Sequence, residues 1–217
     1  MNDKLIDLPF ILKYFHSSYY YDAYDVIRSR LTNDVLHKVV IQQAFRPPTE
    51  FINFMPESQG YSNMALDLHE YHAFGEYWNA LAENPEEAWP TNIQVSCDYA
   101  SQTSVQTMDV VLGEWSLAIS DCQKYLDGGY AEPYIPPNGS PAVCEYYNGD
   151  FANYPEDYKQ FMRDYMRAQM DAAEAGNGWF FWTAKTENNC APEWDYLFLL
   201  QNGIAPTNLC ERERVCP

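Results

Sequence analysis

Apolar residues follow two patterns in this chain, long segments with helical spacing and short uninterrupted runs. Over residues 5–31 and 155–175 apolar side chains recur every three or four positions, which predicts amphipathic helices. Short apolar runs typical of buried strands lie at 39–41, 64–68, 110–112 and 179–182. Further helices are expected over 76–83, 86–101 and 194–200. Because strands alternate with helices, the pattern predicts an α/β fold with a parallel sheet.

The run at 110–112 contains Val110, Val111 and Leu112, and we expect it to be buried on both faces of the sheet. It ends in Gly113 and Glu114. A glycine at this position allows another group to come close to the backbone. Glu114 is therefore a candidate functional carboxylate, although many glutamates simply close a strand.

Polar and aromatic side chains follow each of the four expected strands. The clusters lie at 42–45, 69–74, 114–116 and 182–185. In a parallel sheet the carboxyl ends of the strands open at one edge, where ligands and catalytic groups collect. The sequence therefore predicts one site that gathers a carboxylate, an imidazole, a phenol and an indole.

Composition restricts the partners of such a site. The chain has 217 residues, enough for a single domain, and carries a formal net charge of −18. This charge argues against nucleic acid and anionic membrane surfaces, both of which would repel the chain. No apolar run approaches the roughly 20 residues of a membrane span. The chain contains 18 Tyr, 11 Phe and 6 Trp, and such side chains suit sugar rings as well as a protein core.

Six cysteines occur at positions 97, 122, 144, 190, 210 and 216. No Cys-x-x-Cys spacing is present, so the cysteines favour disulfides and an oxidising compartment over a zinc site, with free thiols as the alternative. The start of the chain shows no signal peptide. Because the cysteines indicate secretion, we expect that Met1 is not the natural N-terminus.

The candidate chemistry is that of carboxylates. His69, Glu70 and His72 form a poor metal set, since alternate residues of a strand point to opposite faces. The sequence contains no Gly-x-Ser-x-Gly motif and no glycine-rich phosphate loop, and we expect no cofactor. Retaining glycoside hydrolysis uses two carboxyl groups about 5–5.5 Å apart, with aromatic platforms for the sugar.

Several long motifs resemble one family, the fungal exo-β-1,3-glucanases (glucan 1,3-β-glucosidases) of glycoside hydrolase family 5. The motifs lie at 40–45, 67–74, 113–118, 121–126, 176–187, 191–194 and 202–204. The resemblance implies a (β/α)8 TIM barrel with a retaining mechanism. Residues 1–217 would then form a single, partial catalytic domain, namely the C-terminal half of the barrel with strands five to eight.

The resemblance also implies roles for individual residues. Glu114 would be the catalytic nucleophile, oriented by His69 and Tyr71, which also contact the sugar. The other implied substrate contacts are Trp182 as a platform, Phe45 and Phe74 at the pocket entrance, and Asp127, where the family usually has Asn. Gln42-Gln43 replaces the usual His-Asp and Ala184 replaces a usual Trp, which leaves the linkage preference open.

Two disulfides follow from the same resemblance, Cys122 with Cys144 and Cys97 with Cys216. Cys190 and Cys210 would remain and could pair with each other. Asn138-Gly139-Ser140 is a glycosylation sequon.

The implied function is a secreted or cell-wall glycoside hydrolase that releases glucose from the ends of β-1,3-glucan. The family carries its general acid/base in an Asn-Glu-Pro motif, which this sequence lacks. We therefore expect an incomplete enzyme whose partner is a β-glucan oligosaccharide or polysaccharide. The alternatives are a non-catalytic β-glucan-binding remnant, or a β-glucosidase or β-1,6-glucanase of the same family.

Overall fold

The structure is a computed structural model that describes residues 8–31, 36–124, 126, 144, 147 and 150–217. Asp127 and Asn138, named above for sugar contact and glycosylation, lie outside the described residues.

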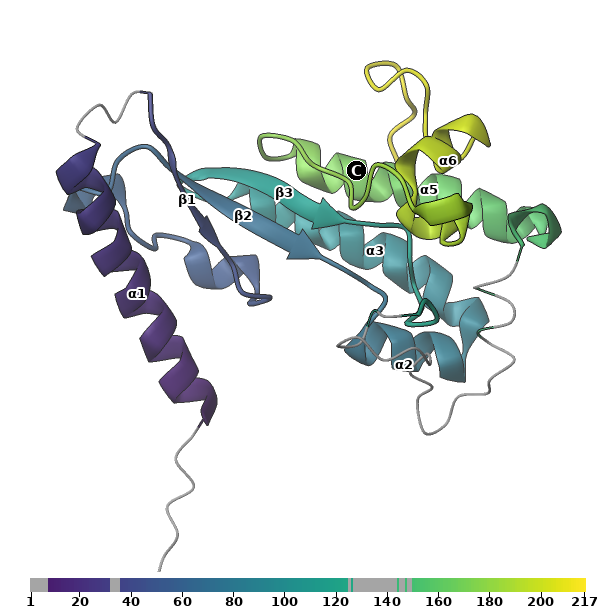
Figure 1. The fold of residues 1–217 in the computed structure, drawn as a ribbon, viewed down its shortest axis with the longest axis horizontal. Helices are drawn as coiled ribbons and strands as arrows, with labels where there is room; N and C mark the ends of the chain where they lie inside the picture. The colour runs from purple at the N-terminus through teal and green to yellow at the C-terminus, as the bar shows by residue number, and fades with distance from the viewer. Residues whose placement is uncertain (1–7, 32–35, 125, 127–143, 145–146, 148–149) are drawn as a thin grey trace, which may run out of the picture.

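A parallel sheet forms the centre of the fold (Figure 1). Its strands are β1 (Val39–Gln42), β2 (Met64–Glu70) and β3 (Asp109–Trp115), in the order β1-β2-β3. The apolar runs at 39–41, 64–68 and 110–112 thus become strands, as predicted.

The fourth expected strand, at 179–182, forms only in part. Trp179 makes a single parallel bridge to Leu112, and the next residues continue alongside β3 in extended form. The Phe180 amide donates to the Leu112 carbonyl at 2.8 Å, and the Trp182 amide donates to the Trp115 carbonyl at 2.8 Å. This segment therefore follows β3 to its carboxyl end.

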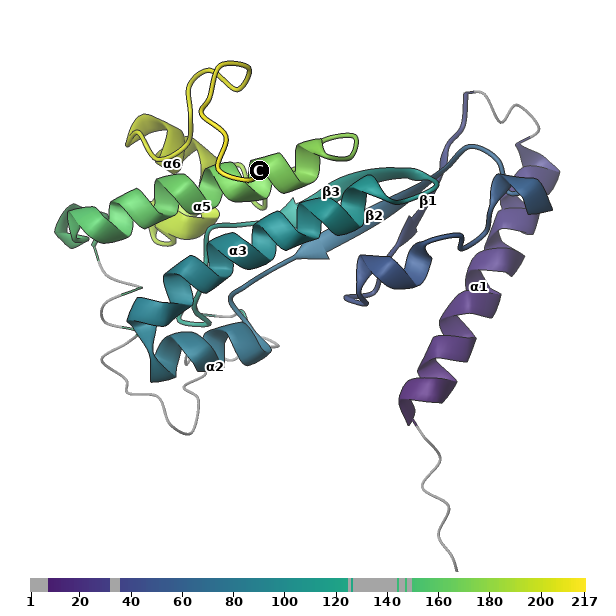
Figure 2. The ribbon, with the colours of Figure 1, turned by 180° about the vertical axis from the view of Figure 1, so that it is seen from behind.

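The helices are α1 (Leu8–Arg30), α2 (Gly75–Glu83), α3 (Pro85–Ser104), α5 (Glu156–Glu174) and α6 (Tyr196–Gln201). α3 and α5 pack on each other and run along one face of the sheet (Figure 2). The helix expected at 194–200 begins later, because Asp195 caps α6 by accepting a hydrogen bond from the Phe198 amide at 2.9 Å. No helix among the described residues is long and apolar enough to cross a membrane.

The core lies between the sheet and α3 and α5. Its members include Ile41, Leu66, Leu68, Val110 and Leu112 from the strands and Tyr158, Phe161, Met162 and Tyr165 from α5. The opposite face of the sheet is more open, because the described helices cover one face. Val40 is 55% exposed and Val111 is half-buried, so the prediction that 110–112 is buried on both faces was wrong for Val111.

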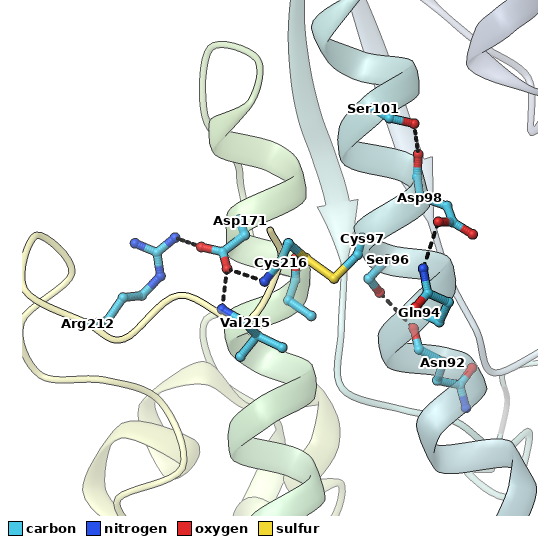
Figure 3. Close-up of a disulfide and its surroundings, with 11 residues drawn as sticks. Asn92, Gln94, Ser96, Cys97, Asp98, Ser101, Asp171, Arg212, Val215 and Cys216 are labelled. Atoms are coloured by element: carbon cyan, nitrogen blue, oxygen red, sulfur yellow. Dashed lines mark hydrogen bonds and ion pairs between the residues drawn. A yellow bond between two sulfur atoms is a disulfide. The ribbon is translucent and has the colours of Figure 1, made fainter.

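The C-terminal tail is fastened to both helices of the core (Figure 3). Cys216 forms a disulfide with Cys97 of α3, and Cys122 forms another with Cys144, which confirms both implied pairs. Cys190 and Cys210 are free and exposed in the structure. The Cys97–Cys216 bond spans 119 residues, and closing a loop of that length stabilises the fold by about 4 to 5 kcal/mol in the chain-entropy model.

A buried carboxylate on α5 also holds the tail. Asp171 accepts hydrogen bonds from the backbone amides of Val215 and Cys216 at 2.7 and 3.1 Å. The Arg212 guanidinium donates to Asp171 at 2.7 Å and to Glu174 at 2.8 Å. The Asp171 side chain is 1% exposed, so its charge depends on these partners.

Replacing Asp171 with Asn should destabilise the protein. The amide removes the charge and points an N–H toward buried donors, so we expect a loss of about 3 kcal/mol in the free energy of unfolding. Urea unfolding under oxidising conditions measures the difference. The matched control is Asp164→Asn on the same helix, where the side chain is 34% exposed and we expect less than about 1 kcal/mol. Equal effects of the two substitutions would contradict the assigned role of Asp171.

Candidate active site

Three of the predicted site residues meet at the carboxyl ends of β2 and β3. The Tyr71 hydroxyl donates to Glu114 Oε2 at 2.8 Å. His69 Nδ1 lies 3.3 Å from the same oxygen. The side chains of Glu114 and His69 are 29% and 18% exposed, so the carboxylate is ordered by its neighbours and still open to a ligand.

An irregularity in the pairing of β2 with β3 creates this arrangement. Leu68 pairs with Leu112, whereas the next residue, His69, pairs with Glu114. Gly113 is therefore the extra residue of a β-bulge, a feature that re-aims side chains at the ends of strands. The bulge brings Glu114 into register with His69.

Tyr71 is held as a hydrogen-bond donor. Burial raises the pKa of its phenol well above 10, and the hydrogen bond to Glu114 and the charge of that carboxylate raise the pKa further. Its ring packs against Trp194 and Phe74, with ring centroids 5.5 and 6.1 Å away. The phenol therefore stays protonated and directed at Glu114.

His69 also faces a second carboxylate, which sequence reasoning did not identify as part of the site. Asp67 Oδ2 lies 3.1 Å from His69 Nε2. The signal was present in the strand pattern, because residues two apart in a strand share a face.

Glu70 and His72 point away from this group, as the strand alternation predicts. His72 is buried, and its Nε2 lies 2.9 Å from Glu70 Oε1. His69 therefore does not join them in one ligand set. Within the part of the chain that the structure describes, no cluster of three or more His, Cys, Asp or Glu is arranged to hold a metal.

A pocket of about 770 Å³ opens beside His69 and Tyr71. Its wall includes Phe45 and Phe74 from the loops after β1 and β2. Phe45 is 72% exposed, so its ring faces solvent at the rim. Glu114 is not part of this wall; it lies at the end of the next strand.

Trp182 is 51% exposed and lies on the segment that runs alongside β3, where its amide donates to the carbonyl of Trp115, the residue after Glu114. Backbone hydrogen bonds to residues 193 and 194 hold the neighbouring segments in place. The Thr183 amide donates to the Trp194 carbonyl at 2.8 Å, and the Leu117 amide donates to the Glu193 carbonyl at 3.0 Å. The exposed indole is thus carried on a fixed backbone.

The Glu193 side chain is buried beneath this anchor. The Tyr154 hydroxyl donates to its Oε1 at 2.7 Å, and the Tyr158 hydroxyl donates at 3.4 Å. Burial raises the pKa of Glu193 to about 7, and the tyrosine hydrogen bonds oppose the increase only in part. The folded state therefore favours a protonated Glu193 in mildly acidic solution.

The chain is similar in sequence to glucan 1,3-beta-glucosidases. No family model matches the chain. The chain is 38% identical over 181 residues to a glucan 1,3-beta-glucosidase of Yarrowia lipolytica, covering 81% of this chain and 41% of that protein. It is 33% identical over 202 residues to a glucan 1,3-beta-glucosidase of Candida oleophila, covering 90% and 45%. The chain thus spans less than half the length of the curated relatives it matches.

Two solved structures have a fold similar to that of this chain. The crystal structure of AoRut matches with a TM-score of 0.52 and 19% identity, covering 87% of this chain and 41% of the other. The rutinosidase from Aspergillus niger matches with a TM-score of 0.52 and 16% identity, covering 87% and 42%. At this level of identity the likeness concerns the fold alone.

Glu193 should make stability depend on pH. Between its usual value of 4.5 and about 7, the folded state binds the proton more tightly than the unfolded state, so stability falls as pH rises through this range. From pH 5 to pH 8 we expect the wild type to lose about 2 to 3 kcal/mol relative to Glu193→Gln, which keeps the size and the acceptor. Urea unfolding of both proteins at the two pH values gives the difference. An unchanged difference would contradict the assignment.

Proposed function

We propose that this chain, a relative of the fungal glucan 1,3-beta-glucosidases that spans less than half of their length, carries the nucleophile of a retaining β-glucan hydrolase site. The observation that supports it most is the setting of Glu114, a partly exposed carboxylate that accepts from Tyr71 and faces His69. In the proposed reaction Glu114 attacks the anomeric carbon of a terminal glucose and forms a glycosyl-enzyme intermediate.

The contacts of Glu114 leave one oxygen for the attack. Tyr71 and His69 both approach Oε2, and Oε1 accepts no hydrogen bond from the described residues. Fixing one oxygen limits rotation of the carboxylate, so that the other is presented in a defined direction.

Exposed aromatic rings support a sugar as the ligand. Trp182 and Phe45 are 51% and 72% exposed, although such rings are usually buried, and Phe74 lines the same pocket as Phe45. Flat apolar faces suit pyranose rings, and the same pocket wall carries charged side chains, namely Arg46, Glu70, Glu76 and Asp98, which can accept or donate hydrogen bonds to sugar hydroxyls. β-1,3-glucan is the proposed substrate because the relatives are glucan 1,3-beta-glucosidases. The two disulfides support a place outside the cell or in the cell wall.

The proposed site has one of the two carboxyl groups that a retaining glycosidase uses. Cleavage of a natural glycosidic bond requires a second carboxyl group to protonate the leaving oxygen, and the sequence has no Asn-Glu-Pro motif to provide it. General acid–base assistance is worth about 10²–10⁴-fold in rate. Natural glucan should therefore be cleaved poorly unless another polypeptide segment supplies this group.

A second candidate is a β-glucan-binding remnant without catalysis. The exposed aromatic rings favour it, because they would serve binding alone. The two candidates differ in whether Glu114 forms a covalent bond.

An activated substrate should reveal the chemistry of this chain without a proton donor. In 2,4-dinitrophenyl β-glucoside the phenolate leaves with its electron pair and needs no protonation, so Glu114 alone can form the intermediate. Azide, which needs no general base, should then attack the anomeric carbon and release the carboxylate. Two inversions retain configuration, so we expect β-glucosyl azide and a turnover that rises at least about tenfold with azide.

The matched variants are Glu114→Gln, which should abolish both phenolate release and the azide product, and the exposed Glu57→Gln, which should leave both unchanged. Phenolate absorbance and NMR of the product measure the outcome. Binding of laminarin without phenolate release in the wild type would favour the binding remnant. Release that persists in Glu114→Gln would contradict the role of Glu114.

A further inference from the structure

We propose that Asp67 positions His69 against Glu114, and that Gly113 lacks a side chain so that the Asp67 carboxylate can occupy the space above it. The inference rests on the proposed function, because it concerns how the nucleophile is held. Asp67 acts through His69, so it is a positioning residue and makes no contact with the reacting atoms.

The imidazole of His69 bridges two carboxylates. Its Nε2 lies 3.1 Å from Asp67 Oδ2, and its Nδ1 lies 3.3 Å from Glu114 Oε2. Asp67 and His69 are both on β2 and, being two residues apart, project from the same face toward β3. The imidazole therefore links Asp67, within β2, to Glu114, near the carboxyl end of β3.

Gly113 completes the arrangement from the neighbouring strand. A Cβ added to Gly113 would lie 1.9 Å from Asp67 Oδ1 and 2.8 Å from its Cγ, far inside contact distance. Gly113 is also the extra residue of the bulge that aligns His69 with Glu114. One residue therefore provides both the register and the space for the Asp67 carboxylate.

The chemistry of the two groups explains what Asp67 can do. An ionised carboxylate only accepts hydrogen bonds, so it selects a ring orientation in which Nε2 carries a proton and faces it. With that orientation fixed, Nδ1 is directed at Glu114 Oε2, and it donates a hydrogen bond there when the ring also carries a proton on Nδ1, since a carboxylate only accepts. Without Asp67 the ring can rotate about χ2, and Glu114 loses one of its two neighbours.

Other uses of the Asp67 side chain find little support. Its Oδ1 is buried and accepts no hydrogen bond from the described residues, so the carboxylate does not serve as a general structural acceptor. Its side chain is 25% exposed. The contact that it makes with His69 is thus the one that accounts for its presence.

Inactivation by 2,4-dinitrophenyl 2-deoxy-2-fluoro-β-glucoside tests the positioning. The fluorine slows hydrolysis of the intermediate, so the first-order rate at saturation reports how well Glu114 attacks. Asp67→Ala and Gly113→Ala should each lower this rate about 10- to 100-fold, the range for lost supporting contacts, with the half-saturating concentration unchanged. The double variant should be no slower than the slower single variant, because both remove the same contact.

The ¹⁵N spectrum of the imidazoles provides a readout that does not need the reaction. Comparison with His69→Gln identifies the His69 signals. In the wild type we expect a hydrogen-bonded proton on Nε2, and this signal should be lost in both single variants. Asp164→Ala, on α5 and outside the candidate site, should match the wild type in both experiments.

Two results would overturn the proposal: a folded Asp67→Ala protein that keeps the wild-type imidazole signals, or rate losses of the two single variants that multiply in the double variant. If the wild type itself is not inactivated, the function proposed for Glu114 fails. The imidazole spectra still decide the role of Asp67 in that case.

Discussion

Parallel pairing of β2 with β3 determines where Glu114 lies relative to His69 and Tyr71. A one-residue change of register in a sheet moves side chains to the other face, so the position of the bulge is decisive. With Gly113 left over, His69 pairs with Glu114, and Tyr71 reaches the same carboxylate from just beyond the end of β2. The core behind the strands, in which Leu68 and Leu112 are buried against the helices, holds this register in place.

The sequence predicts most of the elements because their periodicity is strong. The helix at 155–175 has an apolar face that repeats every three or four residues, and the structure has α5 at Glu156–Glu174. The short strands follow uninterrupted apolar runs. Segment 179–182 is harder to predict, because four consecutive aromatic residues do not show whether they form a regular strand. In the structure the segment makes one bridge and then continues alongside β3.

The site shows where sequence reasoning ends. Strand ends and family motifs point to Glu114, His69 and Tyr71, but the bulge depends on backbone pairing between strands about 40 residues apart in the sequence. The strand pattern places Asp67 and His69 on one face, but it does not show that the two side chains touch. The space that Gly113 leaves for the Asp67 carboxylate is visible only in the structure. The half-burial of Val111 was missed for a similar reason. Whether the second face of a sheet is buried depends on which other segments pack on it, and the sequence of one strand does not show this.

Glu114 is the proposed nucleophile, and Tyr71 and His69 hold its carboxylate in place. The most direct measurement is peptide mapping by mass spectrometry after reaction of the chain with the fluorinated glucoside. We expect one sugar per chain, attached to the peptide that contains Glu114. A sugar on another carboxylate, or an unlabelled chain that still binds β-glucan, would contradict it.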